Sequence, residues 1–237
     1  MRIRIEELTR DELEERLKGD PVIVLPVGAT EAHGPHLPTG TDSLQPEHVA
    51  DRLAERLNGL VAPPIRYGHH SSTKNMVGTL AIGSDTLRSL VGDVLISLAR
   101  NGATRVVVLS GHAGSVHMAA LKVACEEAVR GLDLKVMLLT DYELASELSE
   151  DLGIPAGDSH GGLVETSRVM SIAPHLVKGE RKKGTFVDQE YMILPNPEVC
   201  FPQGFAGRAD LATVETGDRL NRHVVDRLEG IVRRRMA

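Results

Sequence analysis

Apolar and polar positions recur along this chain with two periods, which separate predicted strands from predicted helices. Short runs rich in β-branched residues, bounded by glycine or proline, predict buried strands at 22–27, 105–109 and 134–140. Apolar residues at helical spacing predict helices at 43–57, 85–100, 115–130, 142–152, 162–172 and 215–235. This alternation favours a mostly parallel sheet with helices on both faces.

Local signals complete the pattern. Thr9 with Glu12 three residues later predicts a capping box for a short helix that reaches Lys18. Prolines within 60–65 predict an extended segment at a sheet edge or bulge, because proline cannot donate to a strand ladder. Periodicity fades over 178–210, and a loop of that length is typically a lid, a binding loop or a subunit contact.

Length and composition favour one domain over residues 1–237, of the three-layer α/β/α class. With 237 residues and 41% apolar content the chain can bury a sizeable core. A net charge of -6 without a basic block argues against nucleic acid and anionic membranes as partners. Two cysteines, a charged N-terminus and the lack of a long apolar run predict a cytoplasmic protein without a signal peptide or membrane helix.

Candidate chemistry follows the first predicted strand. Glu31 and His33 are two residues apart, a spacing that points both side chains to one face of extended backbone. Asp42 follows a turn rich in glycine and proline, and we expect it to open the next helix. In open α/β sheets ligands bind at the carboxyl ends of strands, so these residues suit a divalent metal ion there. The alternative reading is an N-cap aspartate, a loop histidine and a surface charge.

Three stretches of sequence carry a resemblance to a known family. They are PVGATEAHGPHLPTGTD at 26–42, LSGHAGS at 109–115 and DSHGGLVETS at 158–167. In this order they resemble the PVGxxExHGxHLPxxTD, GHxG and HxGxxETS blocks of the creatininase family of metal-dependent amidohydrolases. The resemblance extends from about residue 22 to residue 175, and the first block is the specific one.

The resemblance implies a site for two divalent metal ions, with Asp42 bridging them. The implied ligands are Glu31, His33, Asp42, His112 and Glu165. Zn, Fe and Mn all accept such mixed imidazole and carboxylate ligands. Creatininase takes one ligand from a glutamate two residues after the histidine of its second block. Gly114 stands at that position here, so we expect Glu165 to supply the missing carboxylate.

The resemblance also assigns roles around the metals. His160 matches the histidine that opens the third block, and we expect it to act as general acid or base for the leaving nitrogen. The alternative is that His160 only hydrogen-bonds a ligand carboxylate. We expect His36 either to hydrogen-bond a ligand residue without contacting the metals or to be structural. The expected substrate contacts, against the alternative of a merely solvated loop, are His69, Ser71, Ser72, Lys74 and Gly114.

The substrate is inferred from pocket polarity and from the family. The chain has no tryptophan, whereas creatininase closes its pocket over creatinine with tryptophans, which argues against creatinine. Hydroxyls and one lysine in the 69–74 loop suit a phosphorylated substrate. We therefore expect deformylation of a formylamino-pyrimidine ribonucleotide, as in riboflavin and F420 biosynthesis. The family alternatives are a creatinine-type cyclic amide hydrolase and a cofactor-precursor peptidase.

Alternatives outside this class are a non-catalytic metal-binding scaffold and a metallophosphatase. A degenerate scaffold would be expected to lose at least one ligand, whereas this chain retains the full set together with His160. Metallophosphatases usually bring more histidine and asparagine ligands than the three stretches provide. The expected partners are a small-molecule substrate and further copies of this chain in a homo-oligomer.

Overall fold

The computed structural model describes residues 2–236, and a parallel sheet lies at its centre. The four strands run in the order β2-β1-β3-β4, and each neighbouring pair is parallel. The strands are β1 (Ile23–Val27), β2 (Leu60–Val61), β3 (Arg105–Ser110) and β4 (Lys135–Thr140). The predicted α/β class with a mostly parallel sheet is confirmed, and β2 lies at the sheet edge as the prolines predicted.

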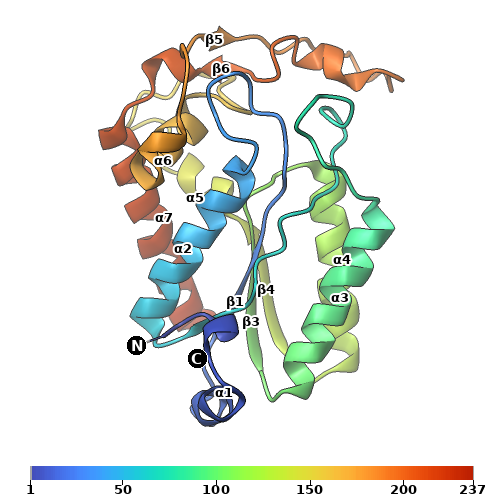
Figure 1. Cartoon of the computed structure of the whole chain (residues 1–237), viewed down its shortest axis with the longest axis vertical. Helices are drawn as coiled ribbons and strands as arrows, with labels where there is room; N and C mark the ends of the chain where they lie inside the picture. The colour runs from blue at the N-terminus through green and yellow to red at the C-terminus, as the bar shows by residue number, and fades with distance from the viewer. Residues whose placement is uncertain (1, 237) are drawn as a thin grey trace.

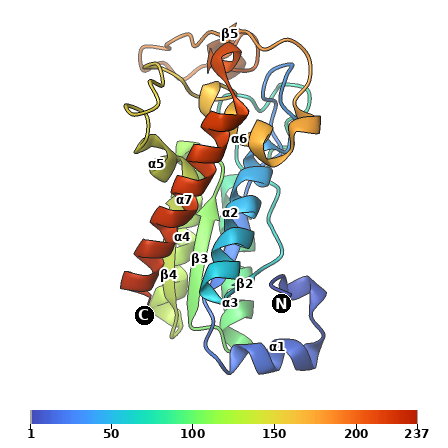
Figure 2. The ribbon, with the colours of Figure 1, turned by 90° about the vertical axis from the view of Figure 1, so that its left-hand side faces the viewer.

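Helices cover both faces of this sheet (Figure 1). The α-helices are α1 (Arg10–Leu17), α2 (Thr41–Leu57), α3 (Ser84–Arg100), α4 (Ser115–Gly131), α5 (Asp141–Ser146), α6 (Leu163–Ile172) and α7 (Val214–Arg235). The pair α3 and α4 packs on one face, while α2, α5, α6 and α7 pack on the other (Figure 1). Figure 2 looks onto α7 and α2, which lie side by side. No helix within residues 2–236 combines the length and apolar character needed to cross a bilayer.

Side chains of successive strand residues divide between two cores. Ile23 and Leu25 of β1 pack with α3 and α4, whereas Val24 packs with α2 and α7. Because both faces are covered, β1 is an unbroken apolar run rather than an alternation of apolar and polar residues. The register pairs Ile23 with Val106 and Val27 with Ser110, so β1 and β3 end at the same level.

The strand order creates a crevice beside β1. The chain leaves β1 for β2 on one side and returns to β3 on the other, so connections diverge at the carboxyl ends of β1 and β3. Such a switch point is where open α/β sheets bind ligands. The loops 28–40 and 111–114 emerge there, and they carry two of the three sequence stretches.

Some predicted boundaries differ from the structure. Gly114 rather than Ser115 is the N-cap of α4, and Ser115 is its first helical residue. The helix predicted at 142–152 is shorter, since α5 ends at Ser146. There the Ser146 hydroxyl donates to the Glu143 carbonyl oxygen, and the backbone continues in turns whose hydrogen bonds span three residues. The capping box between Thr9 and Glu12 is confirmed.

The segment 178–210 covers the carboxyl end of the sheet, at the top of Figures 1 and 2. It contains an antiparallel pair, β5 (Lys183–Gly184) and β6 (Gly207–Arg208). Phe205 from this segment packs so tightly on the first and third sequence stretches that a Cβ at Gly34 or Gly161 would lie 2.6 or 2.7 Å from its ring or stem. The 3-10 helices of the chain are η1 (Ile5–Glu7), η2 (Pro174–Leu176), η3 (Pro197–Cys200) and η4 (Ala209–Leu211).

Candidate metal centre

The three sequence stretches meet at the carboxyl ends of β1 and β3. Glu31 and His33 lie on the loop after β1, and His112 lies on the loop after β3. Gly111 allows the second loop to approach α2, because a Cβ at Gly111 would lie 2.2 Å from the Asp42 carbonyl oxygen. This approach brings His112 beside the first turn of α2, which carries Asp42.

Asp42 lies between two histidines, one from each loop. Its Oδ1 atom is 2.9 Å from Nε2 of His33, and its Oδ2 atom is 2.9 Å from Nδ1 of His112. The side chain is buried in the first turn of α2, where the helix macrodipole favours a carboxylate. One carboxylate therefore faces two groups of side chains with its two oxygens.

The first group, called the His33 centre, consists of His33, Asp42 and Glu165. The Oε2 atom of Glu165 lies 3.4 Å from Nε2 of His33. Glu165 is in the first turn of α6, and its Oε2 atom accepts a hydrogen bond from the backbone N–H of Gly161. The candidate ligand atoms of the three residues lie within 4.8 Å of one another.

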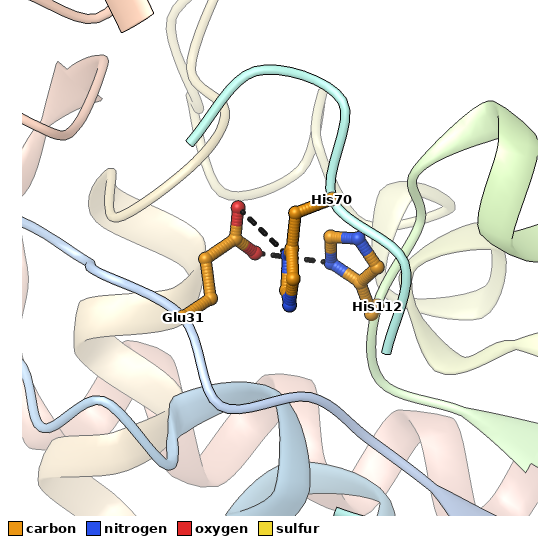
Figure 3. A group of neighbouring side chains, drawn as sticks. All are labelled: Glu31, His70 and His112. Atoms are coloured by element: carbon orange, nitrogen blue, oxygen red, sulfur yellow. Dashed lines mark ion pairs between the residues drawn. The ribbon is translucent and has the colours of Figure 1, made fainter. Parts of the chain in front are cut away.

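The second group, called the Glu31 centre, consists of Glu31, Asp42 and His112. The Oε2 atom of Glu31 lies 3.1 Å from Nδ1 of His112. His70 is packed beside this group, with its Nδ1 atom 3.4 Å from Oε1 of Glu31. Figure 3 shows the imidazoles of His70 and His112 next to the Glu31 carboxylate. The hydroxyl of Thr73 donates a hydrogen bond to Oε1 of the same carboxylate.

Backbone carbonyl groups fix which nitrogen of each histidine faces the carboxylates. Nδ1 of His33 lies 3.0 Å from the carbonyl oxygen of Glu31, and Nε2 of His112 lies 3.1 Å from that of His69. A nitrogen that contacts a carbonyl oxygen carries the proton in the neutral ring. The other nitrogen then has a free lone pair, and in both residues it is the one that faces the carboxylates.

Interactions among the side chains of the cluster shift the pKa values of its carboxylates and imidazoles. Burial opposes the charged form of Glu31, but the charge of His160 and the imidazoles of His112 and His70 hold the pKa of Glu31 well below its ordinary value. Burial also opposes a charged His112, yet Asp42 and Glu31 raise the pKa of His112 to about 10. A nitrogen binds either a proton or a metal ion, so metal binding here would release protons.

Several buried atoms of the cluster have no hydrogen-bond partner within residues 2–236. They are Oε2 of Glu31, Nε2 of His33, Oδ2 of Asp42 and both ring nitrogens of His70. Leaving a buried polar atom without a partner costs about 1–3 kcal/mol, so such atoms are uncommon in native proteins. Carboxylate and imidazole donors at this spacing suit divalent ions such as Zn and Mn. The residues present therefore fit a site for divalent metal ions.

His160 lies at the rim of the cluster, on the loop before α6. Its Nε2 atom is 2.7 Å from the carbonyl oxygen of Ala32 and 4.0 Å from Oε1 of Glu31. Its ring centroid lies 4.1 Å from that of His33. The His160 side chain is 14% exposed, slightly more than that of His112 at 11%, and it lines a cavity together with residues of both centres.

This cavity has a volume of about 370 Å³, and the cluster forms its floor. Ser71 and Ser72 are among its lining residues, as is Phe201 of the 178–210 segment, and contact of the two serines with a substrate stays a prediction. Gly114 also lines the cavity, through backbone alone. Among the lining residues within the described chain there is no lysine or arginine.

Three other predicted residues lie away from this cavity. Nδ1 of His69 contacts the carbonyl oxygen of Ile82, so only the backbone of His69 serves the site, through His112. Lys74 is exposed and is not part of the lining. Nε2 of His36 lies 3.0 Å from the carbonyl oxygen of Gly161. His36 therefore contacts the residue whose backbone N–H donates a hydrogen bond to Glu165.

Two residues at the site were not singled out by the sequence. His70 belongs to the polar loop of expected substrate contacts but received no role of its own. Neighbouring residues on extended backbone point to opposite sides, so the pair His69 and His70 was a signal that one ring faces the site. Tyr142 lines the cavity, and its buried hydroxyl has no hydrogen-bond partner among residues 2–236. Burial, followed by the charge of Glu165, raises the pKa of Tyr142 well above its ordinary value.

Known proteins resemble this chain over most of its length. A sequence profile described as Creatininase, creatinine amidohydrolase, matches residues 6–232. Creatinine amidohydrolase of Pseudomonas putida is 36% identical over 214 residues, which are 83% of this chain and 77% of that protein. The mycofactocin precursor peptide peptidase of Mycobacterium ulcerans (strain Agy99) is 32% identical over 228 residues, 87% of this chain and 82% of that protein. A solved structure described as creatininase Mn superposes with a TM-score of 0.89 at 29% identity, covering 99% of this chain and 98% of the other.

Proposed function

The chain belongs to the creatininase family of metal-dependent amidohydrolases acting on non-peptide C–N bonds, and from this premise we infer that it hydrolyses a small amide in the cavity above Asp42. The observation that carries the proposal is the position of the Asp42 carboxylate, which offers one oxygen to each of two groups of carboxylate and imidazole donor atoms. The cavity opens directly onto both groups.

Five side chains would hold two divalent ions at this cluster. His33 and Glu165 would hold one ion, Glu31 and His112 would hold the other, and Asp42 would contribute to both. When bound, such ions polarise a carbonyl group and lower the pKa of water towards neutrality. The charges of Glu31, Asp42 and Glu165 offset most of the charge of two divalent ions, which stabilises them in a buried site.

His160 is placed to move the proton that amide hydrolysis requires. Water adds its oxygen to the carbonyl carbon, the C–N bond breaks, and the leaving nitrogen takes up a proton. Nε2 of His160 donates to the Ala32 carbonyl oxygen, which leaves Nδ1 to accept a proton and pass it on. Its position between the His33 ring and the cavity suits this role.

The finer proposal is that the amide is a formamide on a pyrimidine ribonucleotide. A formyl group is small, and the hydroxyls of Ser71 and Ser72 line the cavity as that prediction requires. Since Lys74 lies outside the lining, a phosphate would have to reach beyond the cavity wall to meet it. The absence of tryptophan continues to argue against creatinine.

The test is a product assay on three substrates with the metal-loaded protein. We would incubate it with a formylamino-pyrimidine ribonucleotide, with creatinine and with a short peptide, and identify products by mass spectrometry. Formate from the nucleotide supports the finer proposal. Cleavage of another amide keeps the amidohydrolase and replaces the substrate. Two bound metals with no product would keep the amidohydrolase class and reopen the substrate, whereas release of inorganic phosphate contradicts the proposed function.

We further expect the chain to form a homo-oligomer. Apolar side chains protrude from the 178–210 segment, among them Phe186, Met192 and Ile193, the last being 94% exposed. Apolar groups gathered on one segment are typical of a protein interface. Light scattering of the purified protein measures the mass directly, and a mass near 25.6 kDa would contradict this expectation.

A further inference from the structure

His70 is a buried imidazole without a hydrogen bond to either ring nitrogen inside the described chain. The residue is 2% exposed, and neither ring nitrogen has a hydrogen-bond partner within residues 2–236. A histidine in a core normally donates one ring nitrogen to a carbonyl group, as His33 does. A missing partner at both nitrogens therefore requires an explanation.

The geometry around His70 matches that of a metal ligand. Its Nδ1 atom lies 3.4 Å from Oε1 of Glu31, and Nδ1 of His112 lies 3.1 Å from Oε2 of the same carboxylate. Donors held about 2.0–2.2 Å from one metal ion at tetrahedral angles are separated by roughly 3.4 Å. The candidate ligand atoms of Glu31, His70 and His112 all lie within 4.8 Å of one another, and Figure 3 shows them converging.

The Glu31 centre lacks a fourth protein donor without His70. Glu165, which we expect to supply the carboxylate that position 114 lacks, lies beside His33 and so belongs to the other group. Residue 114 is a glycine and has no side-chain donor. His70 comes from the loop after β2, and its ring centroid lies 4.8 Å from that of His112.

We propose that His70 is a direct ligand of the metal ion in the Glu31 centre. This proposal rests on the proposed function, because it presupposes that the cluster holds metal ions. The Glu31 centre then has two imidazole and two carboxylate donors, whereas the His33 centre has one imidazole and two carboxylates. A hydrogen bond from His70 to Glu31 is the competing reading, and 3.4 Å is long for one.

The unequal donor sets have a consequence for metal selectivity. Imidazole nitrogen suits Zn, Cu, Fe and Ni, whereas oxygen-rich sites suit Mn and Mg. The Glu31 centre should therefore retain a Zn-type ion, and the His33 centre should exchange more readily with Mn. The two ions of one chain would then differ in identity when both metals are available.

The experiment compares cobalt binding by the full chain and by His70→Ala. Cobalt alone is the probe, and calorimetry or absorption follows the binding of successive equivalents. His69→Ala is the matched control, since its ring contacts the Ile82 carbonyl oxygen and its backbone oxygen is retained. Circular dichroism and a thermal melt establish that each variant is folded.

We expect His70→Ala to bind one equivalent of cobalt tightly. Its affinity for the other equivalent should fall by more than the roughly 10–100-fold that loss of a residue hydrogen-bonded to a ligand costs. His69→Ala should bind two equivalents like the unmodified chain. Added imidazole should restore the lost equivalent, because it can occupy the space of the missing ring. Proton spectra of the cobalt form should show three shifted imidazole N–H signals, of which His70→Ala lacks one.

The outcomes separate this proposal from the proposed function. If His70→Ala binds both equivalents as tightly as the unmodified chain, His70 is not a ligand, and the two-metal amidohydrolase is unaffected. If the unmodified chain binds less than half an equivalent, the two-metal site itself fails and His70 fails with it. If His70→Ala is unfolded, the number of shifted imidazole signals in the unmodified chain decides, since two signals exclude His70.

Discussion

The Nε2 atom of His112 lies 3.1 Å from the backbone carbonyl oxygen of His69, on the side of the ring away from the carboxylates. In the neutral ring this contact fixes the proton on Nε2, so that the lone pair of Nδ1 is directed at Glu31 and Asp42 and can replace its proton by a metal ion. The loop after β2 thus orients a donor that belongs to the loop after β3.

Replacing the shared carboxylate should remove both metals. We expect Asp42→Ala to bind fewer than half an equivalent of metal and to lose nearly all activity, because each centre loses a donor. Elemental analysis per chain is the measurement. Asp51→Ala, on the same helix and paired with Arg4 at 2.7 Å, is the control and should retain both metals. Retention of two metals by Asp42→Ala would exclude it as the bridge.

His160→Ala should separate metal content from turnover. We expect it to keep both metals and to lose activity by about 10²–10⁴-fold, the typical contribution of a general acid or base. Turnover and metal content are measured on the same preparation. Full loss of metal in this variant would instead make His160 a ligand, in keeping with its 4.0 Å distance from Oε1 of Glu31.

Substitutions of the two residues of the buried ion pair Arg168–Asp141 should have non-additive effects on the free energy of unfolding. Arg168 of α6 donates to Asp141 at 2.7 Å and to Asn221 of α7 at 2.9 Å, and the side chains of the pair are fully buried. Breaking a buried pair by removing one partner costs about 3–5 kcal/mol, because a charge is left alone. Arg168→Met and Asp141→Leu should each lower the free energy of unfolding by this amount, and the double variant by less than the sum.

Denaturant unfolding of the four proteins in this cycle gives the coupling. The exposed pair of Arg227 and Glu147, 2.6 Å apart, is the comparison. Arg227→Met should change the free energy of unfolding by less than about 1 kcal/mol. Strict additivity of Arg168→Met and Asp141→Leu would show that the buried contact does not hold α6 and α5 together.

The buried His117 should make the fold sensitive to acid. Burial is the largest cause that lowers the pKa of His117 to about 3. Between about pH 6.5 and pH 3 the unfolded chain therefore binds a proton that native His117 does not bind, and stability falls as the pH drops. His117→Gln should flatten this fall by at most about 1.4 kcal/mol per pH unit.

Urea unfolding of chelated protein at successive pH values measures that slope. His175→Gln, at an exposed position in η2, is the control and should follow the unmodified chain. Protonation of His117 would also remove the acceptor that its Nδ1 atom offers to the His69 backbone N–H, 3.3 Å away. Equal slopes in all three proteins would contradict the role of His117.

The sequence predicted the strands and long helices because their periodic patterns are local properties. Val22 to Val27 lies between two helical layers, so an unbroken apolar run was sufficient to identify β1. The end of α5 could not be predicted in this way. The helix ends where the Ser146 hydroxyl donates to the Glu143 carbonyl oxygen, an acceptor that a continuing helix would use. The spacing of apolar residues gives no sign of such a hydrogen bond.

The sequence motifs were sufficient to predict that the candidate ligands of the first stretch lie close together. Glu31, His33 and Asp42 do converge, since they follow one strand and open one helix. The place of Glu165 beside His33 rather than His112 depends on how α6 packs against α2, which is a tertiary relationship. For His69 and His70 the alternation along the loop decides which ring faces the cluster, and its phase is not visible in the sequence.

The parallel order of the sheet has a consequence for the kinetics of assembly. Each parallel strand pair forms only after a helical crossover has closed a long stretch of chain, which slows folding. Both centres combine residues from the loop after β1 and the start of α2 with a residue from the loop after β3 or from α6, so no early fragment presents a complete set of donors. Metal ions that bind only the finished fold cannot accelerate its formation. Their presence should lengthen the lifetime of the native state while leaving the refolding rate unchanged.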